Sequence, residues 1–515
     1  MSGEQKMLKT AGFMAMATLL AKVCGLIRDS LIAAYFSTGI EADAFLTASK
    51  LPTMLFDMVI GGVISASFIP IFNGILEKEN REKALSYANK FISMIFCLTT
   101  LIAVLGIVFS DQLIYVLAPK FVGEKHALAA TLSSIMFPMI IFTGLAFSFV
   151  GILQSFGEFN IPAIISLVSN LVLIIYFPLF GNRFGATGLS VAMVIAWSLQ
   201  AIIQIPSLIK LKVKIRPDFR FIDKNIKATL LLAGPMLIST WVQPLYSIVN
   251  SRLASGIDGA PAVLELANRL YTVMVGVFSF VVTNLIFPKL ARANASDNAE
   301  ESKSLIVTSL KAIVLIILPL SVGVLILSRP ITSIIYEHNN FTADDVLLVS
   351  TALRCYAVGM LGLAVNEILS KYFFSVKDSK TPMRNSIISM VSNIALAYLF
   401  FNLIKTPGLA LAAAAGSIIN ALLNSFSLSG RIKHLFSKSD WLSILKIVIS
   451  ALLMALCVFF IYELAGPALY GTIFGNIILC GMCAGFGIIF YFVLCYILGV
   501  DIVRDTINKI IKKER

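Results

Sequence analysis

Six charged side chains interrupt the first two long apolar segments of the sequence: Lys22, Arg28, Asp29, Asp43, Lys50 and Asp57. A Lys or Arg at the centre of a bilayer costs about 2.5–3.5 kcal/mol, so such residues face water or each other rather than lipid. Asp43, Lys50 and Asp57 recur every seven residues, which places them on one face of a helix. We expect these faces to line a water-filled cavity.

The cations in this set predict an anionic ligand. Guanidinium groups bind phosphate through paired hydrogen bonds, and lysine binds it as a point charge. Asp29 is about 100° around the helix from Arg28, so the pattern predicts that the two do not face each other. A cavity for organic cations would instead be rich in carboxylates and aromatic rings. The charges therefore favour a phosphate-bearing substrate, first of all a lipid whose tails stay in the bilayer.

Two further pairs have helical i,i+4 spacing, Glu265 with Arg269 and Glu367 with Lys371. Neighbours at this spacing form ion pairs on one helix face, so a salt bridge that holds a helix in register is the alternative to a cavity role. Pairing of both Arg28 and Arg269 with acidic neighbours would count against the cavity interpretation.

The composition places these residues in a membrane protein. The chain is 58% hydrophobic and only 13% charged, whereas soluble proteins carry about 25% charged residues. The net charge of +13 does not indicate nucleic acid, because the cations lie between the apolar segments. We see no signal-peptide cleavage site, phosphate-binding loop, metal-ligand cluster or nucleophile–base set. The expectation is a protein that is not an enzyme and needs no cofactor or metal.

Breaks at Gly, Pro and charge clusters predict about fourteen transmembrane helices. Their ranges are 7–36, 41–75, 82–117, 126–156, 161–181, 186–212, 225–255, 261–292, 302–328, 343–376, 381–404, 408–432, 441–465 and 471–499. With the N-terminus inside, the inner segments hold 28 Lys and Arg and the outer segments hold 5. This bias predicts that both termini are cytoplasmic.

The sequence also repeats itself. ISLVSN at 165–170 reappears as ISMVSN at 388–393, and GLSVA at 188–192 as GLALA at 408–412, in each case about 220 residues later. The repeat predicts two six-helix lobes of the same orientation, 1–216 and 217–435, with a substrate site between them. Two extra helices at 436–500 and a basic amphipathic tail at 501–515 on the inner membrane surface complete the expected all-α polytopic fold.

Seven short motifs, in chain order, resemble the MurJ (MviN) family of lipid II flippases. They are GLIRD at 25–29, DAF at 43–45, KLP at 50–52, SFIP at 67–70, ANRL at 267–270, FTAD at 341–344 and DSKTP at 378–382. Each motif is weak alone, but the ordered set is fairly specific. The family belongs to a larger group of multidrug and polysaccharide-lipid exporters.

The resemblance implies a transporter of the bacterial cytoplasmic membrane that moves the undecaprenyl-diphosphate-linked peptidoglycan precursor to the outer leaflet by alternating access. It implies that Lys22, Arg28 and Arg269 bind the diphosphate, with Asp29, Asp43, Lys50, Asp57 and Glu265 as supporting cavity charges. The expected drive is the membrane potential or an ion gradient. Expected partners are the lipid-linked precursor and membrane lipids, with cell-wall synthesis proteins left open and nucleic acid excluded.

Two other functions remain open from the residues themselves. One is a flippase for another polyprenyl-diphosphate oligosaccharide, which would need the same fold and the same cations. The other is a cation-coupled multidrug antiporter. Depletion of the protein, followed by identification of the lipid-linked intermediate that accumulates, separates these alternatives.

Overall fold

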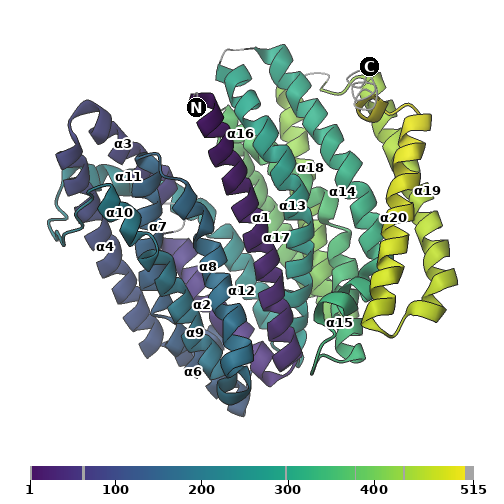
Figure 1. The fold of residues 1–515 in the computed structure, drawn as a ribbon, viewed down its shortest axis with the longest axis horizontal. Coiled ribbons are helices and arrows are strands. Elements are labelled where there is room, and N and C mark those ends of the chain that lie inside the picture. The colour runs from purple at the N-terminus through teal and green to yellow at the C-terminus, as the bar shows by residue number, and fades with distance from the viewer. Residues whose placement is uncertain (1–2, 61–63, 296–297, 377, 433–434, 505–515) are drawn as a thin grey trace. The chain divides into compact units, whose positions relative to one another are not determined.

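The computed structural model describes residues 3–60, 64–295, 298–376, 378–432 and 435–504 of the chain (Figure 1). Every regular element within these ranges is a helix. The chain forms two compact units, unit 1 from Met1 to Ala262 and unit 2 from Val263 to Arg515. The all-helical class predicted from the sequence is confirmed.

Unit 1 contains twelve α-helices and two short π-helical turns. They are α1 (Gly3–Phe36), α2 (Ile40–Val59), η1 (Ile64–Phe68), α3 (Ile69–Lys78), α4 (Arg81–Val108), α5 (Ser110–Leu117), α6 (Gly123–Met136), α7 (Met139–Ser155), α8 (Asn160–Tyr176), η2 (Phe177–Gly181), α9 (Asn182–Ile202), α10 (Ile205–Lys210), α11 (Lys224–Thr240) and α12 (Val242–Ala254). Helix α1 packs mainly against α8, α2 against α6, and α4 and α9 against α7. This packing positions the charged residues of α1 and α2.

Unit 2 holds the remaining helices. They are α13 (Ala260–Ala295), which begins at the end of unit 1, α14 (Ala299–Tyr336), α15 (Ala343–Ala357), α16 (Met360–Ser375), α17 (Lys380–Ile404), α18 (Thr406–Arg431), α19 (Lys438–Leu469) and α20 (Ile473–Ile497). Helix α18 packs against α17, α16 and α15. Helices α19 and α20 pack against each other and against α14, around a core that includes Leu315, Met454 and Tyr491.

The last two helices are fixed to α14 by polar contacts as well. Lys311 of α14 is buried, and its Nζ donates to Asp440 Oδ1 at 2.9 Å and to Asp501 Oδ2 at 2.5 Å. Further along α14, Ser333 accepts a hydrogen bond from Asn476 of α20 at 2.8 Å. The hairpin of α19 and α20 is therefore held to α14 near both of its ends.

Several predicted helices are divided in the structure, and the local sequence explains where. The predicted helix 126–156 is α6 and α7, which are separated by Phe137 and Pro138. The boundary predicted between 181 and 186 falls at Gly185, whose φ of 50° and ψ of −143° interrupt the helix. Glycine adopts such backbone angles without a Cβ clash. The predicted helix 343–376 is α15 and α16, bent by 47°.

Among the described residues, nine helices are long and apolar enough to cross a membrane, or ten if the bent pair α15 and α16 counts as one span. Helices α1 and α2 are not among them. Both carry the charges noted from the sequence, which lower their apolar character. The polytopic class agrees with this result, and the number fourteen stays a prediction.

The compact units divide at residue 262, whereas the repeat places the lobe boundary at 216. The difference arises because α11 packs against η1, α2 and α4, and α12 against α5 and α2. The predicted lobes 1–216 and 217–435 are defined by the repeat rather than by packing and stay a prediction. Most of the predicted tail 501–515 lies outside the described residues.

Candidate functional site: charged side chains of the apolar helices

Arg28 lies on the side of α1 that packs against α8. Its Nη2 and Nε donate to Asp29 Oδ1 at 2.7 and 3.0 Å, and its Nη1 donates to Asn170 Oδ1 of α8 at 3.0 Å. Only 15% of the Arg28 side chain is exposed. The guanidinium therefore joins a carboxylate on its own helix to an amide on the neighbouring helix.

The pairing of Arg28 with Asp29 corrects the sequence interpretation, which predicted that these neighbours do not face each other. The 100° separation describes the directions of the two Cβ atoms. An arginine side chain is long enough to run along the helix surface before its charged group turns. Asn170 on α8 fixes that turn by accepting from the opposite edge of the guanidinium.

Asn170 is a residue whose role sequence reasoning did not assign. Besides accepting from Arg28, its Nδ2 donates to the backbone oxygen of Ala21 at 3.0 Å, so one amide makes two contacts to α1. The signal in the sequence was an asparagine in an apolar helix that recurs at 393 in the repeat. Lys22, expected to act with Arg28, directly follows Ala21 in α1 and is half-buried.

The face of α2 that carries three charges changes in exposure along the helix. Asp43 is fully buried, Lys50 is half-buried and Asp57 is exposed. The seven-residue spacing correctly predicted a shared face, since all three lie within one continuous helix. The exposure of this face thus increases from Asp43 to Asp57. The end of α2 that carries Asp57 can line a polar space, whereas the end that carries Asp43 packs against other helices.

Asp43 is the most enclosed carboxylate of the predicted set. Its Oδ2 accepts from Lys125 Nζ at 2.6 Å and from the backbone N–H of Gly259 at 2.8 Å, and its Oδ1 accepts from the N–H of Ala262 at 2.9 Å. Lys125 also pairs with the exposed Asp258 at 3.0 Å. The structure therefore gives Asp43 a packing role rather than the expected cavity position.

This network depends on one glycine. Gly259 has a φ of +75°, and a Cβ there would lie 2.9 Å from the backbone oxygen of Thr38. The backbone N–H of Gly259 donates to Asp43 in that conformation, which L-residues rarely adopt. The sequence interpretation placed Lys125 in the outer segment before the helix predicted at 126–156, as one of the five cations of the outer segments. Nothing in the local pattern shows that α6 brings Lys125 into contact with Asp43.

Arg269, in unit 2, forms the pair that its spacing predicted. Its Nε lies 3.0 Å from Glu265 Oε1 on the same helix, α13. The Arg269 side chain is 49% exposed and the Glu265 side chain is 15% exposed. Both arginines expected to bind phosphate thus pair with an acidic neighbour, which counts against the cavity interpretation drawn from the sequence. Arg269 nevertheless retains a large accessible surface.

Comparisons with known proteins identify the family. The family model described as lipid II flippase MurJ matches residues 32–478. A probable lipid II flippase MurJ of Rickettsia prowazekii (strain Madrid E) is 30% identical over 422 residues, which is 80% of this chain and 82% of that protein. A second, from Buchnera aphidicola subsp. Schizaphis graminum (strain Sg), is 27% identical and covers 98% of this chain and 99% of its own length.

Solved structures agree with this assignment. A lipid II flippase MurJ in an inward closed conformation has a TM-score of 0.82 at 25% identity, covering 95% of this chain and 99% of that chain. An inward-facing multidrug resistance MATE transporter has a TM-score of 0.69 at 15% identity, over 82% of this chain and 98% of its own, and shows only a shared fold. The suspected family is confirmed: this chain is a multi-pass membrane protein that belongs to the MurJ family of lipid II flippases.

Proposed function

We propose that this protein moves lipid II, the undecaprenyl-diphosphate-linked peptidoglycan precursor, from the inner to the outer leaflet of the bacterial cytoplasmic membrane. The observation that carries the proposal is the match to the MurJ family over residues 32–478. Alternating access between inward-facing and outward-facing states is the expected mechanism, and the MurJ structure with the TM-score of 0.82 is described as inward closed. Lipid II is then the substrate, and cell-wall synthesis proteins are expected as further partners.

We assign the diphosphate contacts to Lys22, Arg28 and Arg269. Lys22 and Arg28 precede the first residue of the family match, so their role rests on their own chemistry. Arginine forms paired hydrogen bonds with phosphate oxygens, and lysine supplies a point charge. Each cation is tested singly, and no shared geometry is required for the test.

A phosphate that forms paired hydrogen bonds with Nε and Nη2 of Arg28 would have to replace Asp29, which accepts from both atoms. In the structure, Asp29 neutralises the guanidinium and so lowers the cost of keeping an unoccupied charge in an apolar helix. A diphosphate carries more negative charge than one carboxylate and offers several acceptor oxygens. Asp29 would therefore act as the counter-ion that Arg28 keeps until the substrate arrives, while Asn170 holds the other edge of the guanidinium in place.

The membrane potential is the proposed driving force, with no cofactor in the chain. One elementary charge that crosses the full potential gains about 2.3 kcal/mol per 100 mV. An interior-negative potential favours outward movement of an anionic head group and return of the cationic site. The direction assumes that both termini are cytoplasmic, which the distribution of Lys and Arg predicts.

The test uses a bacterium whose own lipid II flippase can be switched off. With this chain expressed, lipid II on the outer leaflet should return to normal, and without it lipid II should accumulate inside. The informative variant is Arg28→Gln combined with Asp29→Asn, which removes both charges of the pair and leaves polar groups of similar size. It should reach the membrane at normal abundance but transport no lipid II.

The possible results separate the function from the site. Normal transport by the double variant would show that Arg28 has only a structural role, while the proposed function stands. Continued accumulation of lipid II inside cells that carry the wild-type chain at normal abundance would contradict the proposed substrate. Asp29→Asn alone keeps Arg28 but removes its carboxylate partner at a cost in stability, so its transport is compared per molecule in the membrane, where it should exceed that of the double variant.

A further inference from the structure

The connection between α10 and α11, residues 211–223, is an extended segment that we call the strap. It contains no regular helix. Hydrogen bonds to α4 nevertheless hold it against unit 1. Four of its residues are basic, Lys212, Lys214, Arg216 and Arg220, and all four are exposed. Such a concentration of positive charge at one end of membrane-spanning helices requires an explanation.

Side chains of α4 fix the backbone of the strap. Asn89 makes two hydrogen bonds, accepting from the Arg216 N–H at 3.1 Å and donating to the Lys214 carbonyl at 3.2 Å. Ser93 accepts from the Asp218 N–H at 2.9 Å. Because these bonds involve strap backbone atoms, the basic side chains of the strap are left to point elsewhere.

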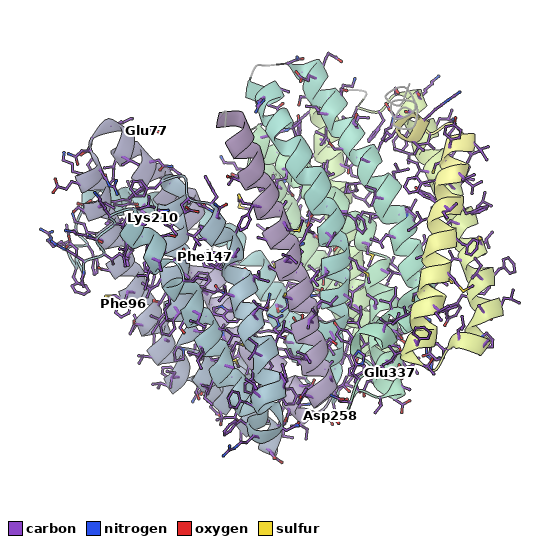
Figure 2. The ribbon with its side chains drawn as sticks, viewed as in Figure 1. Glu77, Phe96, Phe147, Lys210, Asp258 and Glu337 are labelled. Carbon is purple, nitrogen blue, oxygen red and sulfur yellow. The ribbon has the colours of Figure 1, made fainter. Side chains whose placement is uncertain are left out.

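The strap runs along α4, and its last residues, 218–223, which we call its tip, reach the membrane boundary. Arg81 donates to the Leu211 carbonyl, and Ser93 holds Asp218, about 18 Å further along the helix axis. Beyond Ser93 the exposed side chains of α4 are apolar, beginning with Phe96 and continuing through Leu101 and Val104. In Figure 2, Glu77, Lys210 and Phe96 follow one another along unit 1 from its loop end toward this apolar surface.

The tip itself presents apolar side chains outward. Phe219 is 60% exposed and Ile222 is fully exposed, which is unusual for residues of this size in a segment fixed to the protein. Phe219 and Phe221 pack edge to face with ring centroids 6.2 Å apart. Aromatic and aliphatic side chains next to exposed cations are typical of segments that lie in the headgroup region of a bilayer.

The two acidic residues of the strap do not cancel its charge, because each has its own partner. Asp218 accepts from Arg220 Nη2 at 2.7 Å, and this contact lowers the pKa of Asp218 to about 2. Asp223 accepts from Lys90 Nζ of α4 at 2.7 Å, which lowers its pKa as well. Lys212, Lys214 and Arg216 therefore supply the net positive charge of the strap, and Lys210 and Lys224 flank it.

We propose that the strap is a binding site for anionic phospholipids of the leaflet at this end of unit 1, which the charge distribution predicts to be the cytoplasmic leaflet. Lys212, Lys214 and Arg216 bind the headgroup phosphates, and Phe219 and Ile222 enter the interface beside the apolar surface of α4. Lys and Arg side chains near an anionic membrane surface are attracted by its negative potential, and their contributions to binding add up. The inference is independent of the substrate that the protein transports.

The test uses the full-length chain in nanodiscs made either of phosphatidylglycerol or of phosphatidylcholine. Hydrogen–deuterium exchange of peptides that cover 211–223 should be several-fold slower in phosphatidylglycerol. The variant Lys212→Gln, Lys214→Gln, Arg216→Gln should lose this difference while its backbone bonds to Asn89 remain. The control Lys78→Gln, Lys380→Gln, Lys438→Gln removes the same charge from exposed positions at the ends of other helices and should keep the difference between the two lipids.

Two further experiments test whether the apolar side chains contribute to the protection and whether free phosphate is sufficient for it. Phe219→Ser with Ile222→Ser should reduce protection in phosphatidylglycerol although every cation is retained. Inorganic phosphate added to phosphatidylcholine nanodiscs should give no protection. Equal exchange of the wild-type strap in both lipids, equal loss in the strap and control variants, or full protection by phosphate alone would each overturn the proposal. Because exchange is measured without transport, these outcomes leave the proposed function unaffected.

Discussion

Arg28 of α1 and Arg269 of α13 have the same chemistry and different surroundings. Arg28 is mostly enclosed, pairs with the residue next to it and is bound by Asn170 of a second helix. Arg269 is about half exposed and pairs along its own helix with Glu265. One arginine is therefore part of the packing between two helices, and the other is attached to a helix surface.

The difference decides how mutations at these positions should be interpreted. Removing one member of an enclosed ion pair leaves the other charge without its partner, which costs stability whatever the pair does in transport. Removing an i,i+4 pair whose arginine is half exposed costs less stability, so a loss of transport there reports more directly on the ligand. If variants of Arg28 and of Arg269 lost transport equally, the loss at Arg28 could come from lower stability and the loss at Arg269 from a missing ligand contact. Stability must therefore be measured together with transport.

The largest effect is expected for Arg28→Ala, which removes the guanidinium that donates to Asp29 twice inside an apolar helix. Unfolding in mixed micelles of sodium dodecyl sulfate should show a loss of about 3–5 kcal/mol. The variant Arg28→Gln with Asp29→Asn should lose much less, because no charge remains. If the single and double variants were equally stable, the pair would contribute nothing to the packing of α1, and the contrast with Arg269 would disappear.

A smaller effect is expected for Asn170→Ala, which removes both amide contacts to α1. Hydrogen bonds between helices in membranes contribute about 0.6 kcal/mol on average and at most about 1.7 kcal/mol. The matched control is Asn393→Ala, its counterpart in the repeat. The Asn393 Oδ1 atom has no hydrogen-bond partner among the described residues. The same unfolding measurement should show a smaller loss for Asn393→Ala, and the reverse order would contradict the role given to Asn170.

The smallest change in stability is expected for Arg269→Gln combined with Glu265→Gln. An exposed i,i+4 pair on a helix contributes about 0.3–0.5 kcal/mol, and because Arg269 is 49% exposed the unfolding transition should move little. Transport of lipid II, measured as outer-leaflet lipid II in the depleted strain, should nevertheless be lost. Normal transport would remove Arg269 from the proposed phosphate contacts while the family assignment remains.

The sequence was sufficient for the fold class because the signals that define it are local. Runs of apolar residues, their basic flanks and the ordered motifs of the family are read directly along the chain. Helix breaks were predicted less well where the backbone bends without leaving the apolar pattern, as between α15 and α16. The break at Gly185 was anticipated because glycine marks it in the sequence.

The site was predicted only as a set of charges, because pairing depends on contacts between distant residues. Asp43 gave no local sign that Lys125 of α6 and the backbone at 259–262 would enclose it. Arg28 and Asp29 were adjacent, but their contact depends on the side-chain direction that Asn170 fixes from α8. Spacing correctly predicted the pair of Arg269 and Glu265, which lies within one helix.

The attachment of α19 and α20 to α14 has a practical consequence. Lys311 fixes the hairpin near one end and Ser333 near the other, so the three helices should be displaced together during transport. A fluorophore placed on an exposed apolar position of α20, such as Phe486, would then report the displacement of α14. The added hairpin provides a place for a spectroscopic label that leaves the charged residues of α1, α2 and α13 untouched.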